Sequence, residues 1–451
     1  MIVTVVRVEL VAQEPISVSA PEASSVKSAA DLPVAADPWG SPVIPVTGVV
    51  GSLRAHATAQ LGSAAVDLFG GASEVGDADA REGFRPSALR FLGTSVVPAS
   101  SSADDGVLVL RQTAVSRWSG AAEERSLRTR EALPSGSRVV IYAVGEDLGD
   151  LAVDHLRGTL ASWVPRLGGS QSVGAGALAV ESIGHASLDL SNRRDLARWL
   201  GLSGPQSFDS LDFEQWNWKP AGGHSASTLR WAFRIVGDMR IGDEKKTQKS
   251  EITSLRHGED FVIPGSAWKG VFRARAEFIA RSCGLVACDS TDSGACGRPE
   301  CCTCEIFGYS GSAGQADTGA PTGAQARVRF LTSAVKEAKT ATRTHVAIDR
   351  FTGGARRGQL FTETVLTHGR ATLAVEVPPD IESWCVPLLA WAAMDIHDGY
   401  VGVGHGTSRG MGSLQLAKPD VVRKHTTDLA EAMTARRATQ DRGDSLGARD
   451  D

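Results

Sequence analysis

The distribution of apolar and polar residues along the chain predicts both β-strands and helices. The opening segment MIVTVVRVEL and the segments near 137 and 371 have the Val-rich and Ile-rich composition of β-strands. The segments around 150–163 and 383–396 are expected to be helices. Strands and helices should therefore alternate through the whole chain.

Two stretches of the chain carry the same landmarks in the same order. In each stretch an Ile-Pro pair precedes a glycine, an arginine and then a Phe-Gly pair. These landmarks are Ile44-Pro45, Gly51, Arg54 and Phe69-Gly70, and then Ile263-Pro264, Gly270, Arg273 and Phe307-Gly308. Residues 112–122 resemble 345–355, and each stretch ends in a glycine-rich loop and a strand, at 167–180 and 401–416. This pattern predicts one fold duplicated in tandem.

The order of elements within each copy indicates a fold class. Each copy reads strand, loop, helix, strand and hairpin, strand, helix, glycine loop, strand. That order is typical of a ferredoxin-like α+β unit, in which helices cover one face of an antiparallel sheet. We expect domains at 1–185 and 226–420, a linker at 186–225 and a polar tail at 421–451.

Length and composition exclude some classes of protein. The chain has 451 residues, 42% of them hydrophobic, which argues against a mostly disordered protein. Its apolar runs are shorter than the roughly 18 residues needed to span a bilayer. The N-terminal segment lacks the continuous apolar core of a signal peptide, so we expect a cytoplasmic protein. The net charge of -5 argues against a general DNA-coating role but allows a local basic groove.

Six of the seven cysteines lie between Cys283 and Cys304. Clustered thiols in a cytosolic chain are more often metal ligands than disulfides. The best-spaced ligands are Cys288, Cys296, Cys301 and Cys304, with Cys283 as a spare. The spacing predicts a structural zinc site, with Arg298 placed to hold the thiolates. Reduced cysteines in a flexible insertion and a redox centre are the alternatives.

Three motifs suit contact with phosphate groups. Ser266 is expected to cap a helix whose first turns contain Lys269. The glycine loop 402–412 exposes backbone amides that can cradle phosphates. Residues 336–370 mix basic side chains with Phe351, which suits single-stranded nucleic acid. The alternatives are a solvated amphipathic helix, a plain loop and a solvated hairpin.

These motifs resemble the RAMP superfamily. The resemblance rests on IPGSAWKGVFR, the C-x-x-C-x-x-F-G segment, HVAIDRFTGGA and the glycine-rich end, and it covers roughly 1–180 and 226–417. The chain looks like a tandem fusion of two Cas-seven-like backbone subunits of a type III CRISPR complex. The first copy departs at Val46-Thr47 and Val50, where the second has Gly-Ser and Lys.

The resemblance implies that both copies bind a guide RNA, with thumb hairpins that kink the guide–target duplex. The implied partners are guide RNA, target RNA and other subunits of the type III complex, without a membrane. Carried over by motif, the RNA-binding residues are Arg54, Arg117, Trp118, Ser266, Lys269, Arg273, Arg350, Phe351 and Arg409.

The resemblance also implies a catalytic loop at 31–45, which reads DLPVAADPWGSPVIP. Asp31 takes the catalytic slot and Asp37 the later acidic position. A carboxylate there could hold Mg²⁺ or Mn²⁺ or orient a ribose hydroxyl, making the chain a metal-dependent endoribonuclease. In the second copy the same count reaches Ser250, beside Glu251. We expect little or no cleavage there, with Glu251 or Asp243 as the residues that could support it.

Two other functions stay open. A purely structural backbone would bind guide RNA without cutting, and Asp31 would then only cap its loop. A guide-precursor processing enzyme would need a histidine as general acid or base, and His56 is the residue to test.

Overall fold

The computed structural model describes most of the chain. The described residues are 1–19, 30–72, 84–99, 106–117, 119–203, 205–217, 227–243, 251–289, 296–298, 300–310, 323–426 and 434. They form two compact units. Unit 1 comprises Met1–Leu110, Arg128–Gln171 and Ala175–Ser225, and unit 2 comprises Arg111–Leu127, Ser172–Gly174 and Ala226–Asp451.

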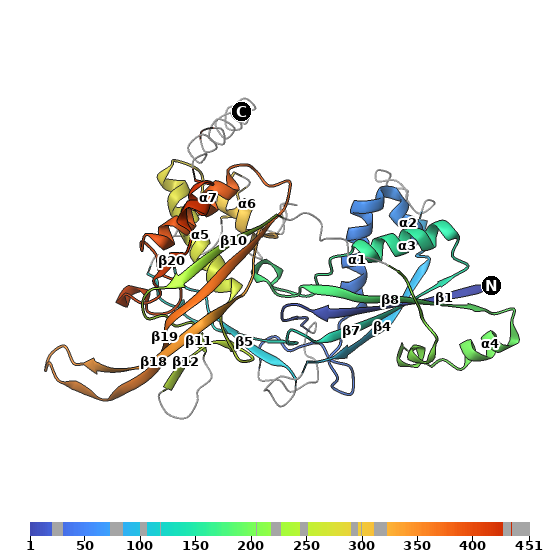
Figure 1. Cartoon of the computed structure of the whole chain (residues 1–451), viewed down its shortest axis with the longest axis horizontal. Coiled ribbons are helices and arrows are strands. Elements are labelled where there is room, and N and C mark those ends of the chain that lie inside the picture. The colour runs from blue at the N-terminus through green and yellow to red at the C-terminus, as the bar shows by residue number, and fades with distance from the viewer. Residues whose placement is uncertain are drawn as a thin grey trace. The chain divides into compact units, whose positions relative to one another are not determined.

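Unit 1 is built on an antiparallel sheet with the strand order β4-β7-β1-β8-β9 (Figure 1). Its strands are β1 (Ile2–Ala12), β4 (Leu89–Val97), β7 (Arg138–Glu146), β8 (Leu178–Asp189) and β9 (Glu214–Gln215). The central strand β1 has near-continuous valine because apolar groups cover both faces of the sheet. Val6 lies between Ala143 of β7 and His185 of β8.

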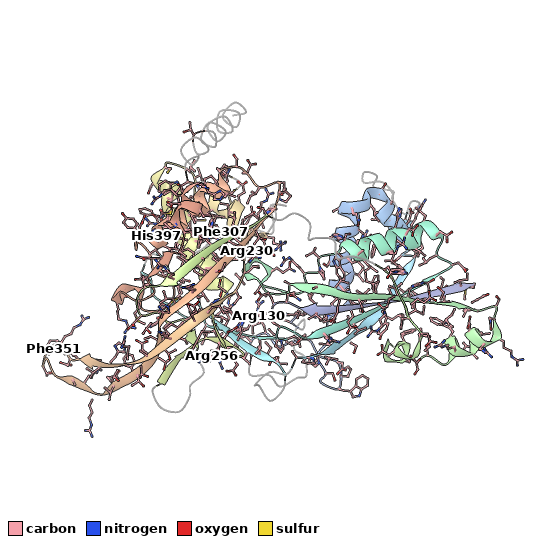
Figure 2. All side chains as sticks on the ribbon, in the orientation of Figure 1. Arg130, Arg230, Arg256, Phe307, Phe351 and His397 are labelled. Carbon is pink, nitrogen blue, oxygen red and sulfur yellow. The ribbon has the colours of Figure 1, made fainter. Side chains whose placement is uncertain are left out.

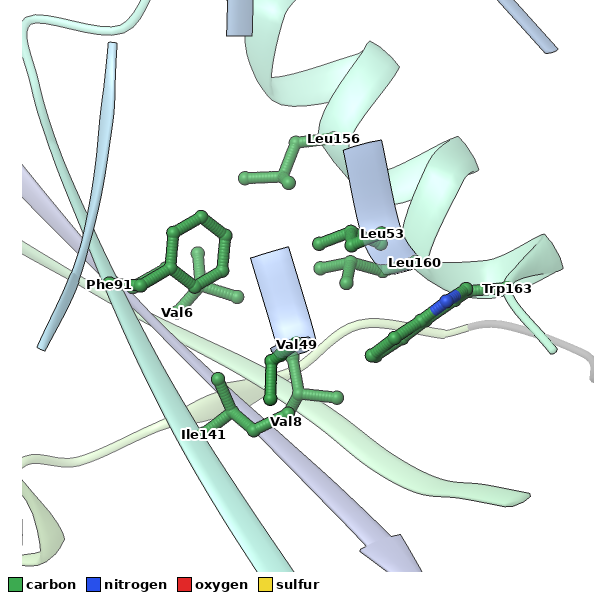
Figure 3. A pocket seen from close by; sticks show the side chains of 10 residues that line it. Val6, Val8, Val49, Leu53, Phe91, Ile141, Leu156, Leu160 and Trp163 are labelled. Carbon is green, nitrogen blue, oxygen red and sulfur yellow. The ribbon is translucent and has the colours of Figure 1, made fainter. Parts of the chain in front are cut away.

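Two helices cover one face of this sheet. They are α1 (Val46–Leu61) and α3 (Asp150–Ser162). Figure 3 shows the apolar interface from close by, with strand residues facing helix residues. Its labelled side chains are Val6, Val8, Val49, Leu53, Phe91, Ile141, Leu156, Leu160 and Trp163. Helix formation here depends on burial of Leu53 and Leu156, because neither helix begins with a side-chain cap.

The segment expected to be a linker folds onto the opposite face of the sheet. It contains the end of β8, α4 (Arg193–Leu200) and a 3₁₀ helix at Pro205–Ser210. Phe208 and Leu211 pack there against Tyr142. Trp216 is instead buried in the core on the helix side of the sheet, and its ring stacks on that of His185 at a centroid distance of 5.1 Å.

Unit 2 repeats the same sheet order as β20-β10-β19-β18 (Figure 1). Its strands are β10 (Ser227–Ile235), β18 (Ser333–Ile348), β19 (Ala355–Val377) and β20 (Leu414–Leu416), with helices α5 (Gly265–Ser282) and α7 (Cys385–His397). The core joins Phe233, Trp268 and Phe272 to Leu388 and Leu389 of α7. β18 and β19 continue beyond the core as a long hairpin.

Shorter elements complete the two units. In chain order they are α2 (Ala65–Phe69), β2 (Gly71–Ala72), β3 (Phe84–Arg85), β5 (Leu108–Gln112), β6 (Arg128–Ala132), β11 (Gly242–Asp243), β12 (Glu251–Ser254), β13 (Arg256–His257), β14 (Asp260–Ile263), α6 (Cys302–Phe307), β15 (Tyr309–Ser310), β16 (Gly323–Ala324), β17 (Arg329–Phe330) and α8 (Pro419–Arg423). Among the described helices, none combines the length and apolar character needed to cross a membrane.

The antiparallel α+β prediction is confirmed, and the two units match in detail. In both, a short helix ends at a glycine with φ near +70°, Gly70 (70°) and Gly308 (73°). A Cβ at Gly70 would lie 2.7 Å from the Arg85 carbonyl oxygen, and one at Gly308 would lie 2.5 Å from that of Ala324. Glycine is thus required at both turns.

The glycine loops are also equivalent. The Leu167 N–H donates to Gly176 O at 2.9 Å, and the Val403 N–H donates to Gly412 O at 2.9 Å. Each loop contains a single 3₁₀ turn, at Gln171–Val173 and Thr407–Arg409.

The start of α5 corrects one expectation. The helix begins at Gly265 with Pro264 as its N-cap and no side-chain cap. Ser266 therefore lies inside the first turn. A Cβ on Gly265 would lie 2.0 Å from Phe330 O, so the close approach of the backbone, not a serine cap, sets this helix start.

We predict that Gly412→Ala destabilises the protein more than Gly410→Ala. Both glycines have φ near +80°, at 81° and 82°. Only at Gly412 would a Cβ meet backbone, 2.3 Å from Val403 O, whereas Gly410 has open space. Gly410→Ala should cost about 1 kcal/mol for the left-handed conformation, and Gly412→Ala at least about 1 kcal/mol more. Urea unfolding of both variants measures this difference, and equal losses would contradict it.

Candidate metal centre and nucleic-acid interface

Four cysteines of unit 2 converge as predicted. The Sγ atoms of Cys288, Cys296, Cys301 and Cys304 all lie within 4.8 Å of one another. The Sγ of Cys288 is 3.7 Å from that of Cys296, 3.7 Å from that of Cys301 and 3.4 Å from that of Cys304. Four thiolates at a Zn–S distance of about 2.3 Å around a tetrahedral ion are separated by about 3.8 Å. The buried cluster therefore fits zinc, and the exposed Cys283 lies outside it.

Local structure places these ligands. Cys301 is the N-cap of α6, so Cys304 follows it within the first turn. Cys288 comes after α5, and its N–H donates to Thr303 Oγ1 at 3.3 Å. A hydrogen bond to Cys296 raises the pKa of Arg298, which agrees with the predicted role of this arginine.

Arg273 turns its guanidinium toward the cysteines. Its Nη2 lies 3.7 Å from Cys288 Sγ and 3.9 Å from Cys304 Sγ, and its Nη1 donates to Gly308 O at 2.9 Å. Its Nε donates to Glu277 at 3.0 Å. These contacts use the guanidinium inside the protein, so Arg273 supports the metal site in the described geometry. Its predicted RNA contact remains a prediction.

Glu277 is the hub of a buried ion-pair chain. Its side chain is 1% exposed and contacts both Arg273 and Arg117. Burial raises the pKa of Glu277, and the two arginines act against that rise. Arg117 belongs to the segment 111–127, which is part of unit 2. The predicted thumb residue Arg117 is therefore held by a carboxylate, while Trp118 lies outside the described residues.

The sequence contains a signal for Glu277 that lies outside the motifs described above. Glu277 follows Arg273 by four residues on a helix, which is the spacing of an ion pair on one face. Its second partner, Arg117, is 160 residues away and could not be found from spacing.

Lys269 is the basic group nearest the start of α5. Its Nζ donates to Ser172 Oγ at 2.9 Å. Burial, followed by repulsion from Arg273, lowers the pKa of Lys269 to about 8. Among the described residues no acidic side chain pairs with it. A half-buried ammonium without an acid beside it suits a phosphate ligand. Ser266, three residues earlier, is half-buried.

Two residues of α1 have different surroundings. Arg54 is exposed, as an RNA contact requires. His56 Nε2 lies 2.9 Å from Ser162 Oγ, at the contact between α1 and α3. That hydrogen bond gives His56 a packing role and supplies no support for acid–base chemistry.

Asp31 and Asp37 are both placed in the loop before α1. Thr129 donates to Asp31 Oδ2 from its N–H at 2.7 Å and from its hydroxyl at 2.8 Å. The first of these hydrogen bonds is the main cause of a lowered pKa at this exposed carboxyl. Asp37 Oδ1 accepts the N–H groups of Trp39 and Ser41 at 2.9 and 2.8 Å. The Asp37 carboxylate thus stabilises its own turn. At Asp31 both hydrogen bonds from Thr129 go to Oδ2, and Oδ1 takes no part in them.

Strand pairing shows which residue of unit 2 corresponds to Asp31. Leu32 pairs in parallel with Arg130, and Ile252 pairs in parallel with Glu363. Asp31 immediately precedes Leu32, and Glu251 immediately precedes Ile252. Asp31 contacts Thr129, and Glu251 pairs at the equivalent place with Thr362. The backbone therefore places Glu251 in the equivalent position, one residue later than the count to Ser250. The side chains of Glu251 and Asp243 lie outside the described residues.

The tip of the β18–β19 hairpin is fully open to solvent. Phe351 is 100% exposed and projects from the tip in Figure 2. Asp349 Oδ1 accepts the N–H groups of Phe351 and Thr352, which fixes the turn that carries Arg350. The exposed Phe351 is free of packing contacts that would prevent stacking on a base, and its contact with RNA stays a prediction.

A family model described as the RAMP superfamily matches residues 25–179 and 232–415. The two matched segments cover most of the chain, and each includes a glycine loop. No curated protein matches the chain.

We predict that the purified protein contains about one zinc ion per chain. Cys304→Ser should lose most of the metal and should also raise hydrogen exchange in α5 and α6, because Arg273 would lose its thiolate partners. Cys283→Ser is the matched control and should retain the metal. Elemental analysis and hydrogen-exchange mass spectrometry measure both effects. Equal zinc in the two variants would contradict the ligand assignment.

The ion-pair chain gives a second prediction. Glu277→Gln should destabilise unit 2 by about 3 kcal/mol, because it leaves two arginines without their buried carboxylate. Hydrogen exchange should rise in 111–127 as well as in α5. Glu305→Gln on α6 offers a comparison at a less buried glutamate. Unchanged exchange in 111–127 would show that Arg117 does not hold this segment.

Proposed function

The chain belongs to the RAMP superfamily, and from this premise we propose that it is a guide-RNA-binding backbone subunit of a type III CRISPR complex. In this proposal two ferredoxin-like units are fused, and both bind the guide. The main support is that the two family matches coincide with two sheets of the same strand order. The proposal keeps domains at 1–185 and 226–420 and a tail at 421–451, and it keeps 186–225 as the connecting segment, part of which packs on the first sheet.

RNA contact is proposed for side chains that face solvent or lack an acidic partner. Lys269 and Ser266 lie at the start of α5, and Arg54 is exposed on α1. Arg350 and Phe351 occupy the hairpin tip. Arg409 lies in the second glycine loop with its side chain 45% exposed. Arg117 and Arg273 would act indirectly, by holding the segment 111–127 and the metal centre.

We predict that Lys269→Gln weakens binding of single-stranded RNA by about three- to tenfold and lowers the salt dependence by about one counterion. Since the pKa of Lys269 is lowered to about 8, its charge is present below pH 8 and is lost above it. The difference between wild type and variant should therefore shrink above pH 8. Lys418→Gln, at an exposed position before α8, is the control. Equal affinities of wild type and Lys269→Gln at pH 7 would contradict this contact.

Target RNA cleavage is proposed at Asp31. Thr129 holds the carboxylate through Oδ2, which leaves Oδ1 to contact a ribose hydroxyl or a divalent ion such as Mg²⁺ or Mn²⁺. The lowered pKa keeps the group ionised at neutral pH. The same pairing supports Glu251 over Asp243 as the residue to test in unit 2, where we expect little or no cleavage.

A structural backbone without cleavage is the second candidate. Its support is that Thr129 caps Asp31 and that Asp37 closes a turn, so both carboxylates already have roles in the loop. Both candidate functions imply a cytoplasmic location and association with other subunits of the complex.

The two candidates differ in one assay. The complex, copurified with its guide, is incubated with labelled complementary RNA and Mg²⁺. Asp31→Asn can still accept hydrogen bonds from Thr129 but lacks the negative charge, so it should keep the loop and lose one cleavage product by at least about 100-fold. Glu251→Gln is run beside it, after equal guide content is confirmed. An unchanged product pattern in Asp31→Asn would favour the structural backbone.

A further inference from the structure

Unit 2 contains a buried carboxylate surrounded by cations that neither the zinc site nor the cleavage proposal uses. Glu363, on β19, is fully buried. Arg240 Nε lies 2.7 Å from its Oε2, and His345 Nε2 lies 2.7 Å from its Oε1. Arg409 of the glycine loop lies 3.8 Å from the same Oε1. We call these four residues and His405 the Glu363 cluster.

The fold brings these residues together from four segments. His345 lies on β18, where it is paired with Phe361 and stacks on its ring at 5.2 Å. Arg240 follows β10, and its carbonyl accepts the N–H of His405 at 2.8 Å. The loop can approach so closely because residue 404 is glycine, whose Cβ would lie 2.5 Å from Arg240 O. The glycine loop therefore lies directly over the cluster.

Positive charge exceeds negative charge in this cluster. Two arginines and two histidines face the single carboxylate of Glu363. The nearby Asp238 is occupied by Arg343, which contacts both of its oxygens at 2.7 and 3.0 Å. Arg240 and His345 each approach an oxygen of Glu363 at 2.7 Å, so both groups are paired with this carboxylate. Arg409 approaches the same carboxylate only at 3.8 Å, so Glu363 offsets the positive charge of the cluster only in part.

The cluster is accessible from one side. The Arg409 side chain is 45% exposed and that of His345 is 35% exposed, whereas Arg240 is 5% exposed. His405 is exposed in the loop above them. An anion that entered here would meet Arg409 and the two imidazoles, with Glu363 and Arg240 beneath them.

We propose that the Glu363 cluster is a binding site for a phosphate group whose affinity depends on protonation of His345 and His405. The phosphate belongs to an RNA strand, either as an internal phosphodiester or as a terminal phosphate. The RNA source rests on the proposed function, whereas the anion site itself does not.

The surroundings set the sign of the pH dependence. Partial desolvation of the ring, followed by repulsion from Arg240 and Arg409, lowers the pKa of His405, and Glu363 acts in the opposite direction. His345 faces Glu363 and lies within the field of Asp238. A bound anion stabilises both imidazolium ions, so binding takes up protons. Affinity should therefore fall as the pH rises through the range in which the histidines lose their protons.

Unit 1 lacks this chemistry at the equivalent place. Strand pairing puts Arg130 where unit 2 has Glu363. In unit 1 the Gly169 N–H donates to Ser17 O at 2.8 Å, and in unit 2 the His405 N–H donates to Arg240 O at 2.8 Å. Ser17 therefore corresponds to Arg240, and Gly169 corresponds to His405. The histidine-dependent site is therefore specific to unit 2.

The test uses the full chain and two probes whose own charge stays constant between pH 6.0 and 8.0. One is single-stranded RNA with a 5′-hydroxyl, and the other is sulfate, followed by its effect on thermal unfolding. RNA affinity of wild type should be about tenfold higher at pH 6.0 than at 8.0, since two imidazoles gain charge. His405→Gln should lower this ratio, and His405→Gln combined with His345→Gln should lower it further, to the smaller residual that the loss of the Lys269 charge near pH 8 contributes. His425→Gln, an exposed histidine after α8, should leave the ratio unchanged.

The outcomes separate the two proposals. If the wild-type ratio survives in the double variant, or if sulfate protects both proteins equally at pH 6.0, the phosphate site is wrong. If wild type binds no RNA at either pH but sulfate protection depends on the two histidines, the RNA proposal fails and the anion site stands. Tighter binding of 5′-phosphorylated than of 5′-hydroxyl RNA, lost in the double variant, would identify a terminal phosphate as the ligand.

Discussion

In each sheet a central strand is hydrogen-bonded along both edges, and the other elements are positioned around it. β1 pairs with β7 and β8, and β10 pairs with β19 and β20. A slip of one residue in β10 would turn the buried Trp231, Phe233 and Ile235 to the opposite face, so the register of this strand is strongly specified. That register decides which face receives the helices and where the glycine loop meets the chain. The functional loops are therefore placed by the sheets.

Charge balance links the cysteine cluster to helix α5. A zinc ion bound by four thiolates leaves excess negative charge, which Arg273 and Arg298 are placed to offset. Glu277 then holds Arg273 from its other side and also engages Arg117. A buried carboxylate is costly without such partners, so the two arginines and Glu277 depend on one another. Arg273 thereby connects the cysteine cluster to Glu277 and, through Glu277, to Arg117.

The two units share a backbone and differ in chemistry. Glycines with positive φ stand at equivalent turns, because any Cβ there would strike backbone atoms. The side chains around those turns are under no such constraint. Asp31 and Glu251 hold one position, and Arg130 and Glu363 hold another. The two units thus share the loop geometry while each carries a different set of charged groups.

The sequence by itself determined the repeated order of landmarks, the alternation of strands and helices and the four cysteines, because each depends on short spacings and residue type. Only the tertiary structure decided that Glu251, not Ser250, aligns with Asp31, since register depends on pairing with a distant strand. Only the tertiary structure shows that Arg117 contacts Glu277, which is 160 residues away, and that Glu363 is buried among cationic side chains. Such contacts join segments that no local pattern relates, and burial makes their charges interdependent.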